Sequence, residues 1–150
     1  MPKVSLIIQA RMDSTRLPGK SMLDLAGQPL VVRLLERVKR CKNVDNIILA
    51  IPDTENNKIL EEQAINMNVD CFRGPENNLV KRYWLAAKEY KSEIIVRLPA
   101  DNPTPESSEI DKIIDFHITK NQNGFSSNLA EINNSGYPDG IGAEVFSFEH

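Results

Sequence analysis

Three cations lie close together near the start of the chain, in a segment rich in small polar and turn-forming residues. They are Arg11, Arg16 and Lys20, within the segment Gln9-Ala10-Arg11-Met12-Asp13-Ser14-Thr15-Arg16-Leu17-Pro18-Gly19-Lys20. Guanidinium groups pair bidentately with phosphate, and the backbone N–H groups of turns supply further donors. The segment therefore suits an oxygen-rich polyanion such as a triphosphate. The alternative is that the three cations only keep a surface loop solvated, as most charged residues do.

The spacing of this segment excludes two common phosphate-binding motifs. It carries neither the Gly-x4-Gly-Lys-Ser/Thr of P-loop proteins nor the Gly-x-Gly-x-x-Gly of dinucleotide-binding proteins. The short hydroxyl side chain of Ser14 and the bare backbone of Gly19 would still let phosphate approach the chain closely.

The segment follows a strand-like run, and such runs alternate with helical patterns along the chain. Strands are predicted at 3–10, 46–51, 70–72 and 93–98, and helices at 29–41, 54–68 and 77–91. A fourth helix is predicted from Thr104 and Pro105 onward, with Thr104 as its cap, followed by weaker strands at 124–128 and 143–148. This alternation indicates an α/β fold with a mostly parallel, doubly wound sheet. Such sheets bind ligands beyond the carboxyl ends of their strands, which is where the cationic segment lies.

A carboxylate is expected at the same edge of this sheet. Asp101 follows the apolar run 94–96 by a few residues, which places it at the carboxyl end of a central strand. Mg²⁺ prefers hard oxygen ligands and usually takes one or two protein carboxylates together with phosphate oxygens and water. Asp101 is therefore a candidate Mg²⁺ ligand, although an Asp before Asn-Pro is as typical of a turn or a helix cap.

Composition and charge limit the classes of protein to consider. The chain has 150 residues, enough for one domain with a real core, and no repeat or linker divides it. Its formal net charge of −3 gives no basic footprint, so neither a nucleic acid nor a membrane is expected as a partner. The N-terminus leads into a predicted strand too short for a signal core or a membrane span, so a cytoplasmic location is expected.

Several separated segments resemble the sugar-acid cytidylyltransferase family, and in particular its spore coat polysaccharide biosynthesis protein F branch. The cationic segment is the first of them. The others occur in the same order as in that branch, at 27–30, 69–74, 78–83, 86–90, 96–103, 137–140 and 144–147. The resemblance covers essentially the whole chain. It implies a three-layer α/β/α fold with a mixed, mostly parallel sheet, the nucleotide-diphospho-sugar transferase fold, which is glycosyltransferase A-like and Rossmann-like.

The resemblance also implies an activity. Enzymes of this family transfer CMP from CTP to a sugar acid and release pyrophosphate, here for surface or spore-coat polysaccharide. The resemblance also implies Mg²⁺ as cofactor, CTP and a sugar acid as partners, and a homodimer. Members of the family usually run longer, so residues 1–150 are expected to form a single nucleotide-binding domain that lacks the C-terminal part of the family domain.

Site residues are implied by matching positions. Arg16 and Lys20 would be catalytic, by stabilising the departing pyrophosphate, and Asp101 would bind the metal. Nucleotide binding would fall to Gln9, Ala10, Arg11, Ser14, Asp53, Asn78 and Arg82. For Arg82, pairing with Glu89 on the same helix or with another surface acid is the alternative.

One position departs from the family pattern. The family commonly has an acid where this chain has Gly142, which leaves Asp139 and Glu144 as candidates for a second metal ligand. An ordinary role at a turn or a strand edge is at least as typical of each. Two other functions therefore stay open. One is a catalytically impaired nucleotide-binding or oligomerisation module, and the other is a nucleotidyltransferase for another nucleotide sugar.

Overall fold

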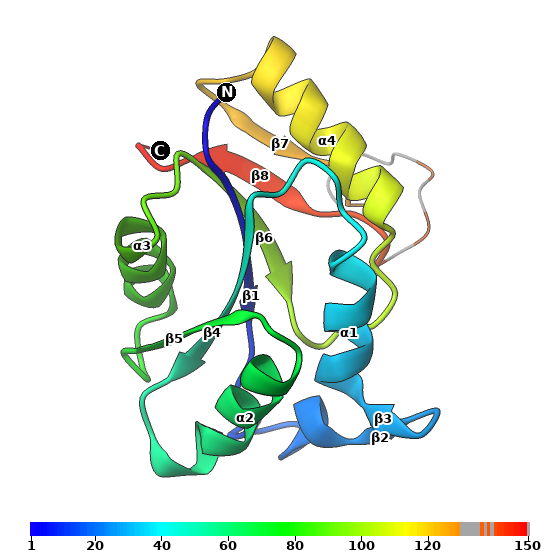
Figure 1. Cartoon of the computed structure of the whole chain (residues 1–150), viewed down its shortest axis with the longest axis vertical. Helices are drawn as coiled ribbons and strands as arrows, with labels where there is room; N and C mark the ends of the chain where they lie inside the picture. The colour runs from blue at the N-terminus through cyan, green and yellow to red at the C-terminus, as the bar shows by residue number, and fades with distance from the viewer. Residues whose placement is uncertain (130–135, 137, 139, 150) are drawn as a thin grey trace.

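Six strands form one mixed sheet in the computed structural model, in the order β5-β4-β1-β6-β8-β7 (Figure 1). The structure describes residues 1–129, 136, 138 and 140–149. The strands are β1 (Val4–Gln9), β4 (Asn46–Pro52), β5 (Asp70–Gly74), β6 (Ile94–Pro99), β7 (Phe125–Ser127) and β8 (Glu144–Ser147). The first four run parallel, whereas β8 is antiparallel to both β6 and β7. The prediction of a mixed, mostly parallel sheet is confirmed.

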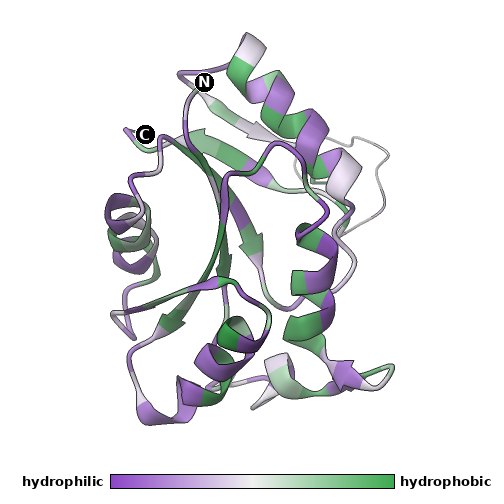
Figure 2. Cartoon of the chain, in the orientation of Figure 1, coloured by the Kyte–Doolittle hydropathy of each residue, from purple (hydrophilic) through white to green (hydrophobic). Residues whose placement is uncertain are grey.

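Helices lie on both faces of the sheet, which makes three layers (Figure 1). One face is covered by α1 (Leu30–Val38), α2 (Lys58–Asn66) and α4 (Ser107–Lys120), and α3 (Leu79–Glu89) lies on the other. Alternate residues of β1 explain the two faces, because Leu6 and Ile8 join the first core and Ile7 joins the second. In Figure 2 the central strands are mostly hydrophobic, while the helices combine hydrophobic and hydrophilic residues, as expected for elements with one buried side.

Pairing in the centre of the sheet places two loops side by side. Gln9, the last residue of β1, lies opposite Ala50 of β4 on one side and Pro99 of β6 on the other. Just beyond, the Ala10 N–H donates to the Ala50 carbonyl at 3.3 Å, and the Ala100 N–H donates to the Gln9 carbonyl at 3.0 Å. The chain that leaves β1 and the chain that leaves β6 therefore start from adjacent, fixed positions.

The fold differs from the sequence prediction in two local features. A short hairpin of β2 (Asp24–Leu25) and β3 (Gln28–Pro29) was not predicted, and its turn residues Ala26 and Gly27 both have positive φ, at 54° and 83°. The prediction that Thr104 caps the fourth helix is wrong, because α4 begins at Ser107 with Glu106 as its N-cap.

Tertiary contacts explain the late start of α4. The Glu106 N–H donates to the Ile141 carbonyl at 2.9 Å, and Arg37 of α1 binds both the Pro105 carbonyl and the Glu106 carboxylate, at 2.7 and 2.9 Å. These contacts from distant parts of the chain hold residues 105 and 106 in a non-helical course.

Candidate active site

A hollow of about 150 Å³ opens at the carboxyl edge of the sheet, between the loop after β1 and the loop after β6. Its lining comprises Gln9, Ala10, Arg11, Ser14, Thr15, Arg16, Lys20 and Ser21 from the end of β1 and the first loop, and Pro99, Ala100 and Asp101 from the end of β6 and the second loop. The structure thus brings together all the site residues predicted from the first loop and the predicted metal ligand. Three cations and one carboxylate face a space that the parallel strands define.

The first loop is closed by its own backbone. The Met12 carbonyl accepts hydrogen bonds from the Ser14 and Gly19 N–H groups, at 3.0 and 2.8 Å, so the stretch from Ser14 to Gly19 closes back onto one residue. Gly19 has φ of 71°, a conformation that L side chains rarely adopt, and it caps the short 3₁₀ helix η1 (Lys20–Met22). This left-handed residue lets the chain turn so that Lys20 lines the same hollow as Arg11.

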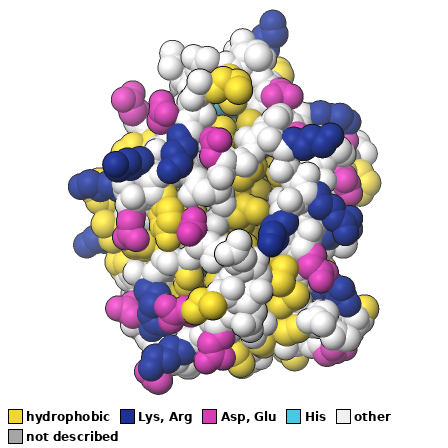
Figure 3. All heavy atoms as spheres, in the orientation of Figure 1, with side chains coloured by type: hydrophobic (Ala, Val, Ile, Leu, Met, Phe, Trp, Pro, Cys, Tyr) yellow, Lys and Arg dark blue, Asp and Glu magenta, His cyan; other side chains and the backbone are white. Residues whose placement is uncertain are grey.

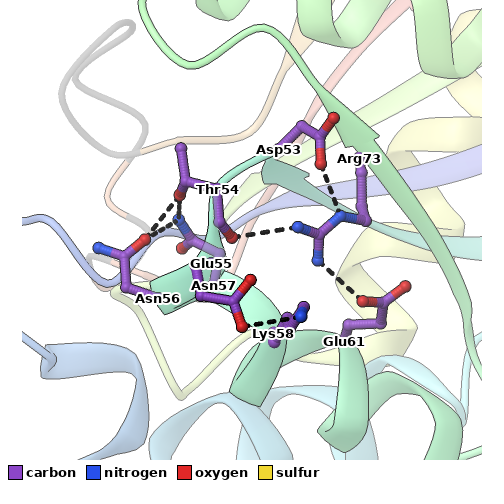
Figure 4. Close-up of polar contacts among 8 residues, drawn as sticks. All are labelled: Asp53, Thr54, Glu55, Asn56, Asn57, Lys58, Glu61 and Arg73. Atoms are coloured by element: carbon purple, nitrogen blue, oxygen red, sulfur yellow. Dashed lines mark hydrogen bonds and ion pairs between the residues drawn. The ribbon is translucent and has the colours of Figure 1, made fainter.

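A second segment anchors the loop from outside, and sequence reasoning missed it. Asn57 is fully buried, and its side-chain Oδ1 accepts a hydrogen bond from the Met12 N–H at 2.9 Å. Its Nδ2 donates to the Thr54 hydroxyl at 2.6 Å, which fixes the orientation of the amide (Figure 4). A signal was present, because Asn57 precedes the buried Leu60 and Ala64 by three and seven residues. It therefore continues the apolar stripe of α2 at the residue just before that helix begins. A polar residue at such a position needs a buried partner.

We expect Asn57→Ala to destabilise the protein and weaken nucleotide binding. The substitution leaves the Met12 N–H without its acceptor and removes the buried amide, which costs about 1–3 kcal/mol. Urea unfolding measures the loss of stability, and calorimetric titration with CTP measures the effect of a looser loop. The matched control is Asn66→Ala, because Asn66 is exposed on α2. Equal unfolding free energies for wild type and Asn57→Ala would contradict this role.

Lys20 and Asp101 form an ion pair across the hollow. The Lys20 Nζ donates to Asp101 Oδ2 at 2.7 Å, and the two side chains are 25% and 41% exposed. The hydrogen bond from Lys20 lowers the pKa of Asp101 below its usual value against the opposing effect of partial burial, and the positive charge of Arg16 adds to the lowering. Asp101 is therefore a carboxylate over the whole physiological pH range.

A second hollow of about 400 Å³ adjoins the first and shares Pro99 and Asp101 with it. Glu144, one candidate for a second metal ligand, lines this space and forms an ion pair with Arg97. Gly142 also lines it, and a Cβ built at Gly142 would lie 2.8 Å from the backbone oxygen of Asn128 and 2.4 Å from its side-chain Oδ1. An acidic side chain at this position would thus require Asn128 to move. Asp139 lies outside the described residues.

The residues present fit a nucleotide-bound Mg²⁺ rather than a metal held by protein alone. In the described part of the chain, no group of three or more His, Cys, Asp or Glu side chains could hold a metal ion. Asp101 offers one partly exposed carboxylate beside the cationic loop. One carboxylate, completed by phosphate oxygens and water, is a common coordination set for Mg²⁺.

Three predicted nucleotide-binding residues, Asp53, Asn78 and Arg82, do not line the first hollow. Asp53 pairs with Arg73 at 2.9 Å, in the cluster drawn in Figure 4. The Asn78 Oδ1 caps α3 by accepting from the Lys81 N–H at 2.9 Å. Their contacts with a nucleotide stay predictions.

Arg82 is 1% exposed, and its guanidinium donates to the carbonyls of Pro75 and Glu76, at 2.5 and 3.2 Å. The alternative pairing of Arg82 with Glu89 is therefore wrong. These two bonds tie the loop between β5 and α3 to the helix, and a contact of Arg82 with a nucleotide also stays a prediction.

The surface outside the two hollows shows no single dominant charge on the face drawn in Figure 3, where basic and acidic side chains are interspersed. No helix in the described part of the chain is long and apolar enough to cross a membrane.

Comparison with known proteins agrees with this geometry. The chain is 36% identical over 122 residues to the spore coat polysaccharide biosynthesis protein SpsF of Bacillus subtilis, covering 79% of this chain and 51% of that protein. It is 34% identical over 116 residues to a 3-deoxy-manno-octulosonate cytidylyltransferase of Anaeromyxobacter dehalogenans, covering 76% of this chain and 47% of that protein. The chain thus spans about half the length of these curated relatives.

A solved structure shows the same fold over nearly the whole chain. It is a cytidylyltransferase from Leptospira borgpetersenii, 35% identical, with a TM-score of 0.90 over 99% of this chain and 62% of that one. The predicted nucleotide-diphospho-sugar transferase fold is confirmed. The family model described as "Cytidylyltransferase" matches residues 5–139, a span that contains both loops of the first hollow, and the chain belongs to the cytidylyltransferase family.

Proposed function

We propose that this chain carries the nucleotide-binding and catalytic part of an enzyme that transfers CMP from CTP to a sugar acid, for polysaccharide biosynthesis. The observation that supports this most is the first hollow, where Arg11, Arg16 and Lys20 surround a space that Asp101 borders from the opposite loop. The cations suit the negative phosphate oxygens of a triphosphate, and the carboxylate suits the divalent cation bound to it. The name of the octulosonate cytidylyltransferase supports the cytidine base and the sugar-acid acceptor, and the name of the spore coat relative supports polysaccharide biosynthesis.

In this reaction an acceptor hydroxyl oxygen attacks the α-phosphorus of CTP. A bond forms between that oxygen and phosphorus, the bond to the bridging oxygen of pyrophosphate breaks, and the hydroxyl proton passes to solvent. Arg16 and Lys20 stabilise the negative charge that gathers on the leaving pyrophosphate. Asp101 would hold Mg²⁺, which when bound neutralises charge on the phosphate oxygens. No protein nucleophile is needed, so these side chains act by position and charge.

The second hollow is where the acceptor would bind. It shares Pro99 and Asp101 with the nucleotide hollow, so a ligand there lies next to the metal-binding carboxylate. A homodimer and a cytoplasmic location stay predictions.

A catalytically impaired nucleotide-binding module is the second candidate function. Gly142 favours it, because this position lacks the acid that the family commonly has there, and an acid would require Asn128 to move. Such a module would bind CTP and Mg²⁺ and release no pyrophosphate.

Thermal shift measurements with CTP, UTP, ATP and GTP, each with and without Mg²⁺, test the proposal. A ligand that binds only the native state at 100 times its dissociation constant stabilises it by about 2.7 kcal/mol. We expect CTP with Mg²⁺ to raise the melting temperature most. Pyrophosphate release with candidate sugar acids then separates an active enzyme from an impaired module. Equal shifts with all four nucleotides, or none, would contradict a CTP site.

A further inference from the structure

The ion pair between Lys20 and Asp101 engages two groups that the proposed function needs elsewhere. Lys20 is needed by the phosphates and Asp101 by Mg²⁺, yet the two side chains bind each other at 2.7 Å. They lie 81 residues apart in the sequence and reach the hollow from the loops after β1 and β6. The tertiary fold therefore brings the two side chains together, and their contact lies within the site.

The residue before each partner is tied by a backbone hydrogen bond, so the side chains are the freer part of this contact. Lys20 begins η1 directly after Gly19, whose N–H is bound to the Met12 carbonyl at 2.8 Å. Asp101 follows Ala100, whose N–H is bound to the Gln9 carbonyl at 3.0 Å. The lysine side chain is a compact ammonium on a flexible stem of four carbons, so it can reach another anion in the hollow without any backbone movement.

A carboxylate paired with an ammonium is a poor ligand for a divalent cation, because the cation must displace the ammonium first. The neighbouring charged side chains do not make Asp101 a better metal ligand. Glu144 is itself paired with Arg97, and Arg16 adds a second positive charge near Asp101. A triphosphate changes this balance, since it offers Lys20 several negative oxygens and offers the metal further ligands.

We propose that Lys20 is an exchange residue: it occupies Asp101 while the hollow is empty and transfers to the triphosphate when nucleotide enters, so that a divalent cation binds Asp101 only together with nucleotide. This inference rests on the proposed function and adds an order of events to it. The coupling is reciprocal, so metal strengthens nucleotide binding as much as nucleotide strengthens metal binding.

Binding of Mn²⁺ to the nucleotide-free protein tests the exchange directly. Mn²⁺ serves as the probe because the electron paramagnetic resonance signal of the free ion disappears when it is bound. We expect weak binding to the wild type and binding tighter by up to about fivefold to Lys20→Met, the upper end of what one surface ion pair contributes. Lys20→Arg should bind as weakly as the wild type, because it keeps the positive charge beside Asp101. The double variant Lys20→Met/Asp101→Asn should lose the gain.

Arg16→Met is the matched control. It removes one positive charge from the same hollow but leaves the ion pair, so its effect on Mn²⁺ binding should be clearly smaller than that of Lys20→Met. Three results would overturn the proposal: no tighter binding in Lys20→Met, a gain that persists in the double variant, or an equal gain in Arg16→Met.

The proposed function is tested separately, by thermal shift of the wild type with CTP in the presence of Mg²⁺. No shift there, together with the expected Mn²⁺ series, would confirm that Lys20 blocks Asp101 but overturn transfer of Lys20 to a triphosphate. A CTP shift with Mn²⁺ binding that is unchanged in Lys20→Met would support the nucleotide site and overturn the exchange.

Discussion

Asp101→Asn is expected to remove most of the enhancement that Mg²⁺ gives to CTP binding and to lower CMP transfer by about 100-fold or more. The magnitude is that of losing one group that stabilises charge in the transition state. Asparagine keeps the size of aspartate and removes the charge, so the variant should fold normally and keep some metal-free binding of CTP through Arg11, Arg16 and Lys20. Calorimetric titration of CTP into both proteins at several Mg²⁺ concentrations measures the effect.

The same experiment decides between the metal site and a simple turn. Asn serves in caps and turns about as well as Asp, so a purely structural Asp101 would give the same Mg²⁺ dependence in variant and wild type. That outcome would withdraw Asp101 as a metal ligand. Asp70→Asn is a suitable control, because Asp70 is exposed at the start of β5, at the opposite edge of the sheet.

Local sequence patterns were enough to predict the parts of the site that local structure determines. The apolar run of β1 and the turn formers after it predict a strand followed by a loop, and parallel strands place that loop and Asp101 at one edge. The fold class follows from the same alternation of strands and helices. These features depend on residues within a few positions of one another, where periodicity and turn chemistry are informative.

The parts that escaped prediction depend on partners far along the chain. Asn57 binds the Met12 N–H across 45 residues, and Lys20 binds Asp101 across 81. The start of α4 is set by Arg37 of α1, 69 residues before Glu106. No local pattern records such a pairing, although a polar residue on an apolar helical stripe, such as Asn57, marks where one must exist.

Arg16→Ala is expected to weaken CTP binding by about 1.5–3 kcal/mol, the scale of hydrogen bonds to charged groups. This corresponds to roughly a 10- to 150-fold rise in the dissociation constant. Arg16→Lys should recover only part of the loss, because a lysine ammonium carries the charge but cannot make the bidentate contact of a guanidinium with phosphate. Titration calorimetry at one fixed ionic strength measures all three proteins, since salt screens such contacts.

Arg40→Ala controls for the general loss of a positive charge, because Arg40 is exposed beyond the end of α1 and does not line the hollow. Its affinity for CTP should equal that of the wild type. Arg16 forms no ion pair among the described contacts, but Arg16→Ala also removes the positive charge that Arg16 places near Asp101. Arg16→Lys keeps that charge, so comparing the two variants separates the direct contact with the ligand from the effect of charge. An unchanged affinity in Arg16→Ala would instead support the solvated surface loop that these charged residues also allow, and would remove the observation on which the proposed function chiefly depends.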